Sequence, residues 1–441
     1  MTHHVTVGID IGTSSVKAIA ADADGTVVAS ARIPHAFSVP APLQFEHDAR
    51  TAWFDGPRAA LAALGPVDAA GVAVAAMVPS LTAVDADGMP CAPGLLYGDE
   101  RGSGGAGNPV ESGEFGRFLS WLAAEVPDAR GFWPAQAVAN FGLCGAPVMS
   151  TTAAALAYPL FNWVGWDEAA LGSLGVRLDQ LPALAPSGTA AAEVTGRPGC
   201  VLEGGTIDAM AEQIVAGADN DGDVLVICGT TLIVWCVTPE LADVPGYFPM
   251  PHTTRGKFLV GGPSNAGGLF LDWARRLLRE APPARELALD PGRVPVWVPY
   301  LRGERTPLND STRRGHLVDL DLTHGPAEVR RAAFEAAGFV TRRMIEASPT
   351  PARRIVATGG GVRVDEWVQC LADCTGLPVD IVAVPEGGAL GAAFLARIAA
   401  GLETSTADAA RWARSERTVE PDPAWLAPVA DRYARFLELA S

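Results

Sequence analysis

The sequence predicts an α/β protein built from two related domains. Residues 7–17 and residues 223–235 both have the pattern of a strand, a Gly-Thr turn and a second strand. The second copy begins about halfway along the 441 residues, which indicates a duplicated domain. We place the boundary near residue 218, so the predicted domains span residues 1–218 and 219–441.

The first Gly-Thr turn has the composition of a phosphate-binding loop. Asp10 lies in an apolar strand, where an unpaired charge is costly, so we expect a cation to meet it. Gly12 lets the backbone approach a ligand, and Thr13 and Ser14 offer hydroxyl and N–H groups to phosphate oxygens. Lys17 adds a positive charge. A plain hairpin with a polar turn explains this segment equally well.

The second Gly-Thr turn makes the phosphate interpretation stronger. Gly229, Thr230 and Thr231 repeat the glycine and hydroxyl pattern between two apolar strands. Two such loops in one chain favour a nucleotide held between the two copies of the domain.

Composition and charge exclude several classes of protein. Hydrophobic residues make up 49% and charged residues 19%, as in a globular protein of two or three domains. A net charge of −17 argues against nucleic-acid or anionic-membrane partners. No signal peptide or membrane span is recognised, so we expect a cytoplasmic protein. The seven cysteines indicate reduced thiols, and Cys370 and Cys374 fit a helix core better than a metal site.

Polar residues follow two predicted strands in the first half. The strand 72–77 is followed by Ser80, which we expect to face a ligand. Asp99 and Arg101 come directly after a second apolar strand, at the kind of sheet end where ligands bind. A surface salt bridge explains the Asp99 and Arg101 pair equally well.

The other segments of the first half predict a third strand and two helices. The strand spans residues 26–32, and the helices span residues 49–64 and 118–125. Residues 102–116 are rich in glycine and serine and predict a flexible loop.

Asp208 is the candidate catalytic base. It follows two glycines and opens a predicted helix over residues 209–216, where the helix dipole favours the ionised carboxylate. A plain N-terminal capping role is the alternative at this spacing.

The second half predicts glycine-rich turns next to strands and helices. Asn265 lies in a loop before a helix at 269–279, and Gly359, Gly360 and Gly361 end a strand that begins at residue 355. Such turns suit the packing of a base or sugar against backbone. Further elements are predicted at residues 294–300 (strand), 327–347 (helix) and 365–375 (helix). The small residues of 386–391 predict close approach of a helix or an adenine.

Taken in order, these motifs resemble the FGGY family of carbohydrate kinases, relatives of actin and hexokinase. The resemblance covers most of the chain. It is carried by residues 8–17, Asp99 with Arg101, 204–208, 228–231, 261–265, 300–307, 359–361 and 386–393.

The resemblance implies two actin-like (ribonuclease H-like) domains with ATP in the cleft between them. It implies Asp10 near Mg²⁺, and Gly12, Thr13, Ser14 and Lys17 near the transferred phosphate. It assigns the other phosphates to Gly229, Thr230 and Thr231, the nucleoside to Asn265, Gly359, Gly360 and Gly361, and the sugar proton to Asp208.

The substrate implied is a small sugar with a primary hydroxyl, a ketopentose such as xylulose or ribulose. Its predicted contacts are Glu46, Ser80, Asp99, Arg101 and Asp208. Residues 77–80 replace a Gln-Met-His-Gly stretch usual in xylulokinases, residues 149–152 replace a Thr-Asp-x-Ser motif, and the region 102–150 looks shortened. A polyol or other sugar, or a non-catalytic sensor of ATP and sugar, therefore stays open, as does a homodimer.

Overall fold

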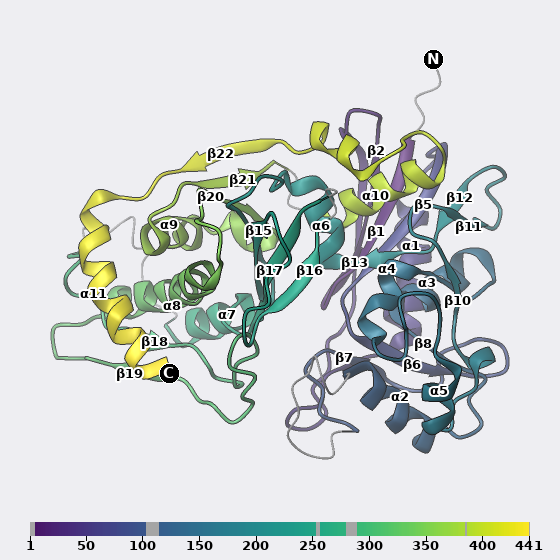
Figure 1. Ribbon diagram of the computed structural model, residues 1–441, viewed down its shortest axis with the longest axis horizontal. Coiled ribbons are helices and arrows are strands. Elements are labelled where there is room, and N and C mark those ends of the chain that lie inside the picture. The colour runs from purple at the N-terminus through teal and green to yellow at the C-terminus, as the bar shows by residue number, and fades with distance from the viewer. Residues whose placement is uncertain (1–4, 103–113, 253–255, 279–288, 384–385, 441) are drawn as a thin grey trace. The chain divides into compact units, whose positions relative to one another are not determined.

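The computed structural model describes residues 5–102, 114–252, 256–278, 289–383 and 386–440. They form two compact units (Figure 1). Unit 1 comprises Met1–Val215 and Gly387–Trp412, and unit 2 comprises Ala216–Glu386 and Ala413–Ser441. The first division lies close to the predicted boundary near residue 218. The structure differs from a single cut there, because residues 387–412 return to unit 1 and pack against its sheet.

The main sheet of unit 1 has the strand order β11-β12-β5-β1-β2-β3, with β13 also paired to β5. The first three strands form an antiparallel meander, as predicted, and β5 runs parallel to β1, β12 and β13. The strands are β1 (Val5–Ile11), β2 (Ser15–Ala21), β3 (Val27–Pro34), β5 (Ala69–Ala76), β11 (Ala190–Glu193), β12 (Val201–Glu203) and β13 (Thr206–Ile207). Strands β1, β2 and β5 are almost wholly buried, so this sheet is the centre of the unit.

Helix α10 (Gly387–Ala399) lies against this sheet and contacts β1 and β5 (Figure 1). A Cβ on Gly8 would lie under 3.0 Å from the Ala389 carbonyl oxygen. A Cβ on Gly391 would meet the Ala211 carbonyl of α6 (Asp208–Ala216) equally closely. The small residues of 386–391 were expected to allow the close approach of a helix or an adenine. In the structure they allow α10 to lie close to β1 and to α6.

The rest of unit 1 contains short strands and helices. The predicted helix 49–64 is present as a π-helical segment and α1, and the predicted loop 102–116 lies largely outside the described residues. The elements are β4 (Glu46–His47), the π-helical Arg50–Asp55, α1 (Gly56–Ala63), β6 (Ser80–Val84), β7 (Gly94–Leu96), α2 (Glu114–Glu125), β8 (Gly131–Trp133), α3 (Ala135–Cys144), β9 (Val148–Ser150), α4 (Thr151–Ala154), α5 (Glu168–Ser173) and β10 (Ala183–Ala185), with 3₁₀ turns at Ala155–Ala157, Leu178–Gln180 and Thr406–Arg411. Strands β4, β7, β6 and β8 form a second sheet in that order.

Unit 2 repeats the arrangement of the main sheet. Its strand order is β16-β17-β15-β14-β20-β21-β22, with β14, β15 and β17 antiparallel and β20 and β21 parallel to β14. The strands are β14 (Asp223–Cys228), β15 (Leu232–Thr238), β16 (Phe248–Pro251), β17 (Phe258–Ser264), β20 (Arg354–Thr358), β21 (Val379–Val382) and β22 (Ser415–Val419), and β18 (Val296–Val298) pairs with β19 (His316–Val318). In both units a three-strand meander is extended from its first strand by two parallel strands, as a duplicated domain requires.

Helices α8 (Pro326–Ala347), α9 (Asp365–Thr375) and α11 (Pro423–Ala440) pack together in unit 2 (Figure 1). Their apolar faces form one core, which contains Cys370 and Cys374, as predicted for these thiols. Among the described residues, unit 2 also contains α7 (Gly268–Leu277) and the 3₁₀ turn Gly360–Arg363.

A buried ionic network joins these three helices. Arg331 Nη2 donates to Asp373 Oδ2 at 2.8 Å, and Arg432 Nε donates to Glu335 Oε2 at 2.7 Å. Arg331 Nε also donates to Glu335 Oε1 at 2.9 Å, which connects the two pairs. Each charge therefore has an opposite partner, as buried charges require.

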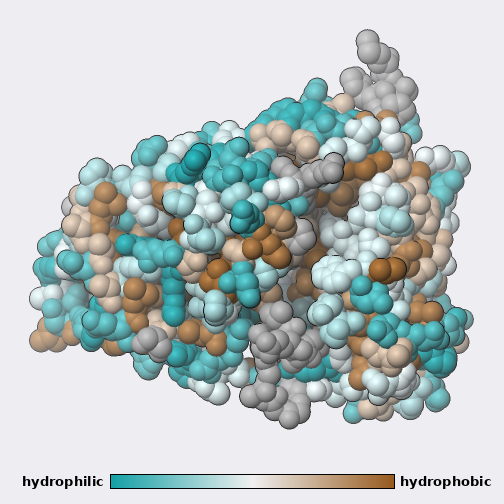
Figure 2. Space-filling model, viewed as in Figure 1, coloured by the Kyte–Doolittle hydropathy of each residue, from teal (hydrophilic) through white to brown (hydrophobic). Residues whose placement is uncertain are grey.

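The face of the molecule drawn in Figure 2 is largely polar. Figure 2 shows hydrophilic residues over much of the visible face, with hydrophobic residues in smaller areas between them. Within the described residues, no helix combines the length and the apolar character needed to cross a membrane.

Candidate active site

Three parallel strands of unit 1 bring the predicted site residues to one edge of the sheet. Ile11 of β1 is in register with Ala76 of β5, and Ala76 is in register with Ile207 of β13. Neighbouring strands are about 4.8 Å apart, so the chain leaves β1 and β13 roughly 10 Å apart at the same carboxyl edge. The Gly12 turn, the segment before Ser80, and Asp208 all begin there. This edge is where ligands bind in parallel sheets.

Asp10 is buried at this edge and is paired, as predicted, with a cation. Lys17 Nζ lies 3.8 Å from Asp10 Oδ2, because the two residues are in register between β1 and β2. The N-terminal turn of α10 also lies here, since a Cβ on Gly388 would be 3.1 Å from Asp10 Cγ. A lysine and a helix N-terminus therefore both place positive charge beside this carboxylate.

The two hydroxyl side chains of the Gly12 turn, Thr13 and Ser14, have different surroundings. The Gly12 N–H donates to the Ser15 carbonyl at 3.0 Å, which closes the turn. The Thr13 hydroxyl lies 3.2 Å from the Tyr97 hydroxyl, whereas Ser14 is exposed. The predicted loop is therefore present, with the Ser14 side chain open to solvent.

His47 supports this turn from beneath and was not recognised in the sequence. The Trp53 indole N–H donates to Nδ1 at 3.0 Å, so Nε2 carries the proton that it donates to the Thr13 carbonyl at 2.8 Å. Burial, with the neighbouring His35 ring, lowers the pKa of His47 to about 4. The ring is therefore neutral, with a fixed tautomer. Nothing in the local sequence pattern marks this residue, since its partners come from different segments.

Glu46, Asp99 and Arg101 form one cluster. Arg101 Nη1 donates to Glu46 Oε2 at 2.7 Å, and Nη2 donates to Asp99 Oδ2 at 2.6 Å. The Phe45 N–H also donates to Asp99 at 2.6 Å, and the guanidinium lies over the Trp121 ring. The alternative of a surface salt bridge does not hold, because the Asp99 side chain is 0% exposed and that of Arg101 is 10% exposed, so the ion pair is buried.

Ser80 is buried and holds a helix end. Its hydroxyl oxygen accepts the Ala135 N–H, the first of α3, at 3.2 Å. Because this N–H has no partner within its own helix, the contact is a capping interaction. Ser80 therefore lies at the predicted sheet edge, and its hydroxyl has a structural contact there.

Asp208 is the first residue of α6, as predicted, and its side chain is half-buried. Its Oδ1 accepts the Ala209 N–H at 2.7 Å. The free N–H groups and dipole of the helix N-terminus stabilise a carboxylate in this position. Asp208 therefore lies at the N-terminus of α6, at the same sheet edge as the Gly12 turn.

The second Gly-Thr turn occupies the equivalent position in unit 2. Ile227 of β14 is in register with Thr358 of β20, so the turn at residues 229–231 and the glycines of 359–361 leave the same edge of the sheet. The Gly268 N–H donates to the Gly229 carbonyl at 2.8 Å, and the Leu269 N–H donates to the Thr230 carbonyl at 3.1 Å. Helix α7 therefore holds the turn, while Thr230 is exposed.

The three glycines differ in what their backbone meets. Gly359 has φ +86°, and a Cβ there would lie 3.0 Å from the Cys228 carbonyl oxygen. A Cβ on Gly361 would overlap the Trp367 ring. Gly360 has no described atom within 4 Å of a Cβ, so packing does not require a glycine there.

The side-chain amide of Asn265 forms hydrogen bonds with a neighbouring loop. Its Nδ2 donates to the Gly303 carbonyl at 3.1 Å, and its Oδ1 accepts from Arg302 Nη2 at 3.1 Å. The buried Glu304 accepts the Asn265 N–H at 3.0 Å and the Ser264 hydroxyl at 2.7 Å. Burial raises the pKa of Glu304 to about 7. This carboxylate was not singled out in the sequence, where it is one of several charges in an exposed-looking loop.

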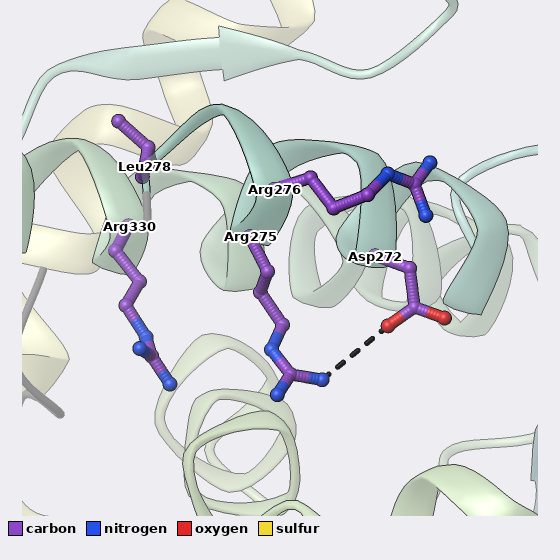
Figure 3. A pocket seen from close by; sticks show the side chains of 5 residues that line it. All are labelled: Asp272, Arg275, Arg276, Leu278 and Arg330. Carbon is purple, nitrogen blue, oxygen red and sulfur yellow. Dashed lines mark hydrogen bonds and ion pairs between the residues drawn. The ribbon is translucent and has the colours of Figure 1, made fainter. Parts of the chain in front are cut away.

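A separate pocket of about 380 Å³ lies on unit 2, beside α7 and α8 (Figure 3). Its lining is Asp272, Arg275, Arg276, Leu278 and Arg330. Arg275 Nη1 lies 3.3 Å from Asp272 Oδ1. It contains none of the predicted site residues, so the candidate site is defined by the sheet edges and not by this pocket.

In the candidate site, Asp10 offers one carboxylate to a magnesium ion. The described residues contain no group of three or more His, Cys, Asp or Glu side chains able to hold a metal. Mg²⁺ in phosphate-transferring enzymes is commonly bound by one or two carboxylates and by substrate phosphates. The single buried carboxylate of Asp10 is compatible with that mode.

Comparison with known proteins identifies the class. The model for the FGGY family of carbohydrate kinases, N-terminal domain, matches residues 5–108, and the one for the C-terminal domain matches residues 224–400. The chain therefore belongs to the FGGY family of carbohydrate kinases. It is an ATP-dependent carbohydrate kinase with two actin-like domains, which confirms the predicted fold, activity and use of ATP.

Three relatives illustrate the range of the similarity. A xylulose kinase from Klebsiella pneumoniae is 28% identical to this chain. The match covers 98% of this chain and 98% of that protein. The crystal structure of a gluconate kinase from Lactobacillus acidophilus matches 99% of this chain and 98% of its own, with a TM-score of 0.84 and 23% identity. That of a xylulose kinase from Rhodospirillum rubrum matches 99% and 98%, with a TM-score of 0.80 and 25% identity.

Proposed function

We propose that this kinase transfers the γ-phosphoryl group of Mg-ATP to a primary hydroxyl of a ketopentose such as xylulose or ribulose. The full-length similarity to xylulose kinases favours this sugar class. The main support for this site is the register of β1, β5 and β13. It supports a common role for Asp10, the Gly12 turn and Asp208 at one sheet edge.

In this proposal Asp208 is the general base. Its carboxylate orients the sugar hydroxyl and takes its proton as the hydroxyl oxygen bonds to the γ-phosphorus. The bond from that phosphorus to the β,γ-bridging oxygen breaks, and ADP leaves. Phosphoryl transfer has a loose transition state that depends on positioning and on charge stabilisation. An ionised aspartate at a helix N-terminus is therefore basic enough.

The phosphate contacts are proposed from both units. Thr13, Ser14 and Lys17 of unit 1 act on the transferred phosphoryl group, and Thr230 and Thr231 of unit 2 bind the other phosphates. When bound, Mg²⁺ near Asp10 would neutralise phosphate charge. The backbones at Gly12 and Gly229 allow close approach to these phosphates.

The nucleoside and sugar contacts complete the proposal. Gly359, Gly360, Gly361 and Asn265 bind the nucleoside, with the open space at Gly360 as the strongest support. Glu46, Ser80, Asp99 and Arg101 make up the sugar site. Because Asp99 is fully buried and paired, it acts by holding Arg101 and Glu46 in place. We further propose a cytoplasmic protein, where ATP is available, that forms a homodimer.

The test is ADP release by purified protein with Mg-ATP and a panel of ketopentoses, aldoses, polyols, gluconate and glycerol. We expect ketopentose-dependent turnover in the wild type and a loss of at least about 10³-fold in Asp208→Ala. Size-exclusion chromatography with light scattering tests the homodimer.

Three outcomes would contradict parts of the proposal. Turnover with another sugar alone would contradict the ketopentose. Near-normal turnover in Asp208→Ala would contradict the base. Tight sugar binding by calorimetry without any ADP release would favour the sensor alternative.

A further inference from the structure

Four buried polar side chains form hydrogen bonds with the two-glycine turn before Asp208 and with the residue that follows it. The turn consists of Gly204 and Gly205, between β12 and β13. Gly205 has φ +92°, a left-handed conformation that favours glycine. The turn sets where β13 ends, and therefore where Asp208 projects from the sheet edge.

Buried side chains donate hydrogen bonds to three successive carbonyl groups of this segment. The Asn140 amide donates to the Gly204 carbonyl at 3.0 Å, and the Ser150 hydroxyl donates to the Gly205 carbonyl. Gln136 donates to the Thr206 carbonyl at 3.1 Å. Asn140, Ser150 and Gln136 are all 0% exposed and come from α3 and the end of β9.

Glu203 supplies the partner for the Gly205 N–H. Its Oε2 accepts this N–H at 2.5 Å, and its Oε1 accepts the Gly188 N–H at 3.0 Å. The residue is 0% exposed. Each carboxylate oxygen therefore accepts a hydrogen bond from one backbone N–H. A protonated carboxyl or an amide offers only one carbonyl oxygen for these two donors.

This arrangement costs stability. Burial raises the pKa of Glu203 to about 7, although the two N–H groups act to lower it. The amide oxygens of Gln136 and Asn140 have no hydrogen-bond partner among the described residues. Buried polar groups with incomplete partners are unfavourable compared with an apolar core. Their presence around one turn points to a requirement for that turn's geometry.

We propose that Glu203 is a positioning residue for phosphoryl transfer, which fixes the Gly204–Gly205 turn and through it the Asp208 carboxylate. The proposal rests on Asp208 as the base. It predicts that loss of the carboxylate slows the chemical step without weakening binding of either substrate, because Glu203 is too deeply buried to contact them.

The test compares Glu203→Gln with Glu193→Gln, an exposed glutamate on the adjacent strand β11. With the sugar identified by the panel, we expect kcat of Glu203→Gln to fall by about 10-fold to 100-fold, with both KM values within about twofold. Hydrogen exchange at the Gly205 amide should accelerate by about 10-fold or more, while Tm and exchange in β1 and β5 stay near wild type. Glu193→Gln should match wild type throughout.

Two results would overturn the inference. One is unchanged kcat and unchanged Gly205 exchange in Glu203→Gln. The other is a kcat loss that accompanies a large fall in Tm and faster exchange throughout unit 1, which would make the residue merely structural. If Glu203→Gln does not fold, Ser150→Ala loosens the same turn at the Gly205 carbonyl and must give the same pattern. Near-normal turnover in Asp208→Ala would refute the base alone, since Gly205 exchange still reports whether Glu203 holds the turn.

Discussion

The contact between α10 and α6 gives a prediction for Gly391→Ala. The added Cβ would lie under 3.0 Å from the Ala211 backbone carbonyl, which must withdraw by roughly 1.5 Å to restore an ordinary contact. Backbone on both sides leaves little freedom to adjust. Overpacking of this kind costs about 3 kcal/mol, so Tm should fall by roughly 6–12 °C. Because Ala211 lies one turn after Asp208, kcat should also fall by about 10-fold or more.

The assay is differential scanning calorimetry together with steady-state kinetics, with Gly116→Ala as the matched control. Gly116 also lies in a helix, but a Cβ there would meet only Leu160 Cδ1 at an ordinary 3.7 Å. This control should raise stability by about 0.5–1 kcal/mol through the lower entropy of the unfolded chain. A Gly391→Ala protein with the Tm and kcat of wild type would refute the reasoning, because it would show that the two helices can separate without cost.

Three further predictions concern charge. The depressed pKa of His47, about 4, means that wild type should lose about 3 kcal/mol more stability than His47→Gln as pH falls from 7 to 4, measured by urea unfolding; equal losses would contradict the neutral ring. The pH dependence of stability is reversed for Glu304, because its pKa is raised to about 7. Its contribution to the free energy of unfolding is present below about pH 4.5 and is lost as pH rises through 7. Between pH 5 and 8 Glu304→Gln should therefore gain stability relative to wild type, and parallel urea curves would argue against this. Arg432→Ala leaves Glu335 with one fewer buried partner and should cost about 3–5 kcal/mol, against under about 0.5 kcal/mol for the exposed Arg435→Ala, as measured by thermal unfolding.

The sequence predicted the features that depend on local pattern. The meander around Asp10, the helix opened by Asp208 and the helix at residues 365–375 follow from apolar periodicity and glycine turns, and all are present. The Asp10 and Lys17 pair was also predictable, because the turn between β1 and β2 fixes their register.

Features that depend on distant segments were not predictable in this way. His47 supports Thr13 across 34 positions, and Ser150 reaches Gly205 across 55. Nothing in the neighbourhood of these residues distinguishes a buried hydrogen-bonding side chain from an exposed one. The return of residues 387–412 to unit 1 was missed for the same reason, since helical periodicity does not say which sheet a helix covers.

That return has a consequence for how the protein is made. The first strand, β1, ends at Ile11, but α10, which covers it, begins only at Gly387. During synthesis from the N-terminus, all of unit 2 up to Glu386 emerges from the ribosome before that cover is available. The nascent N-terminal part therefore exposes an apolar sheet face for most of translation, a condition that chaperones recognise. A fragment ending at Val215 should be aggregation-prone, and supplying residues 387–412 as a separate peptide should restore its solubility.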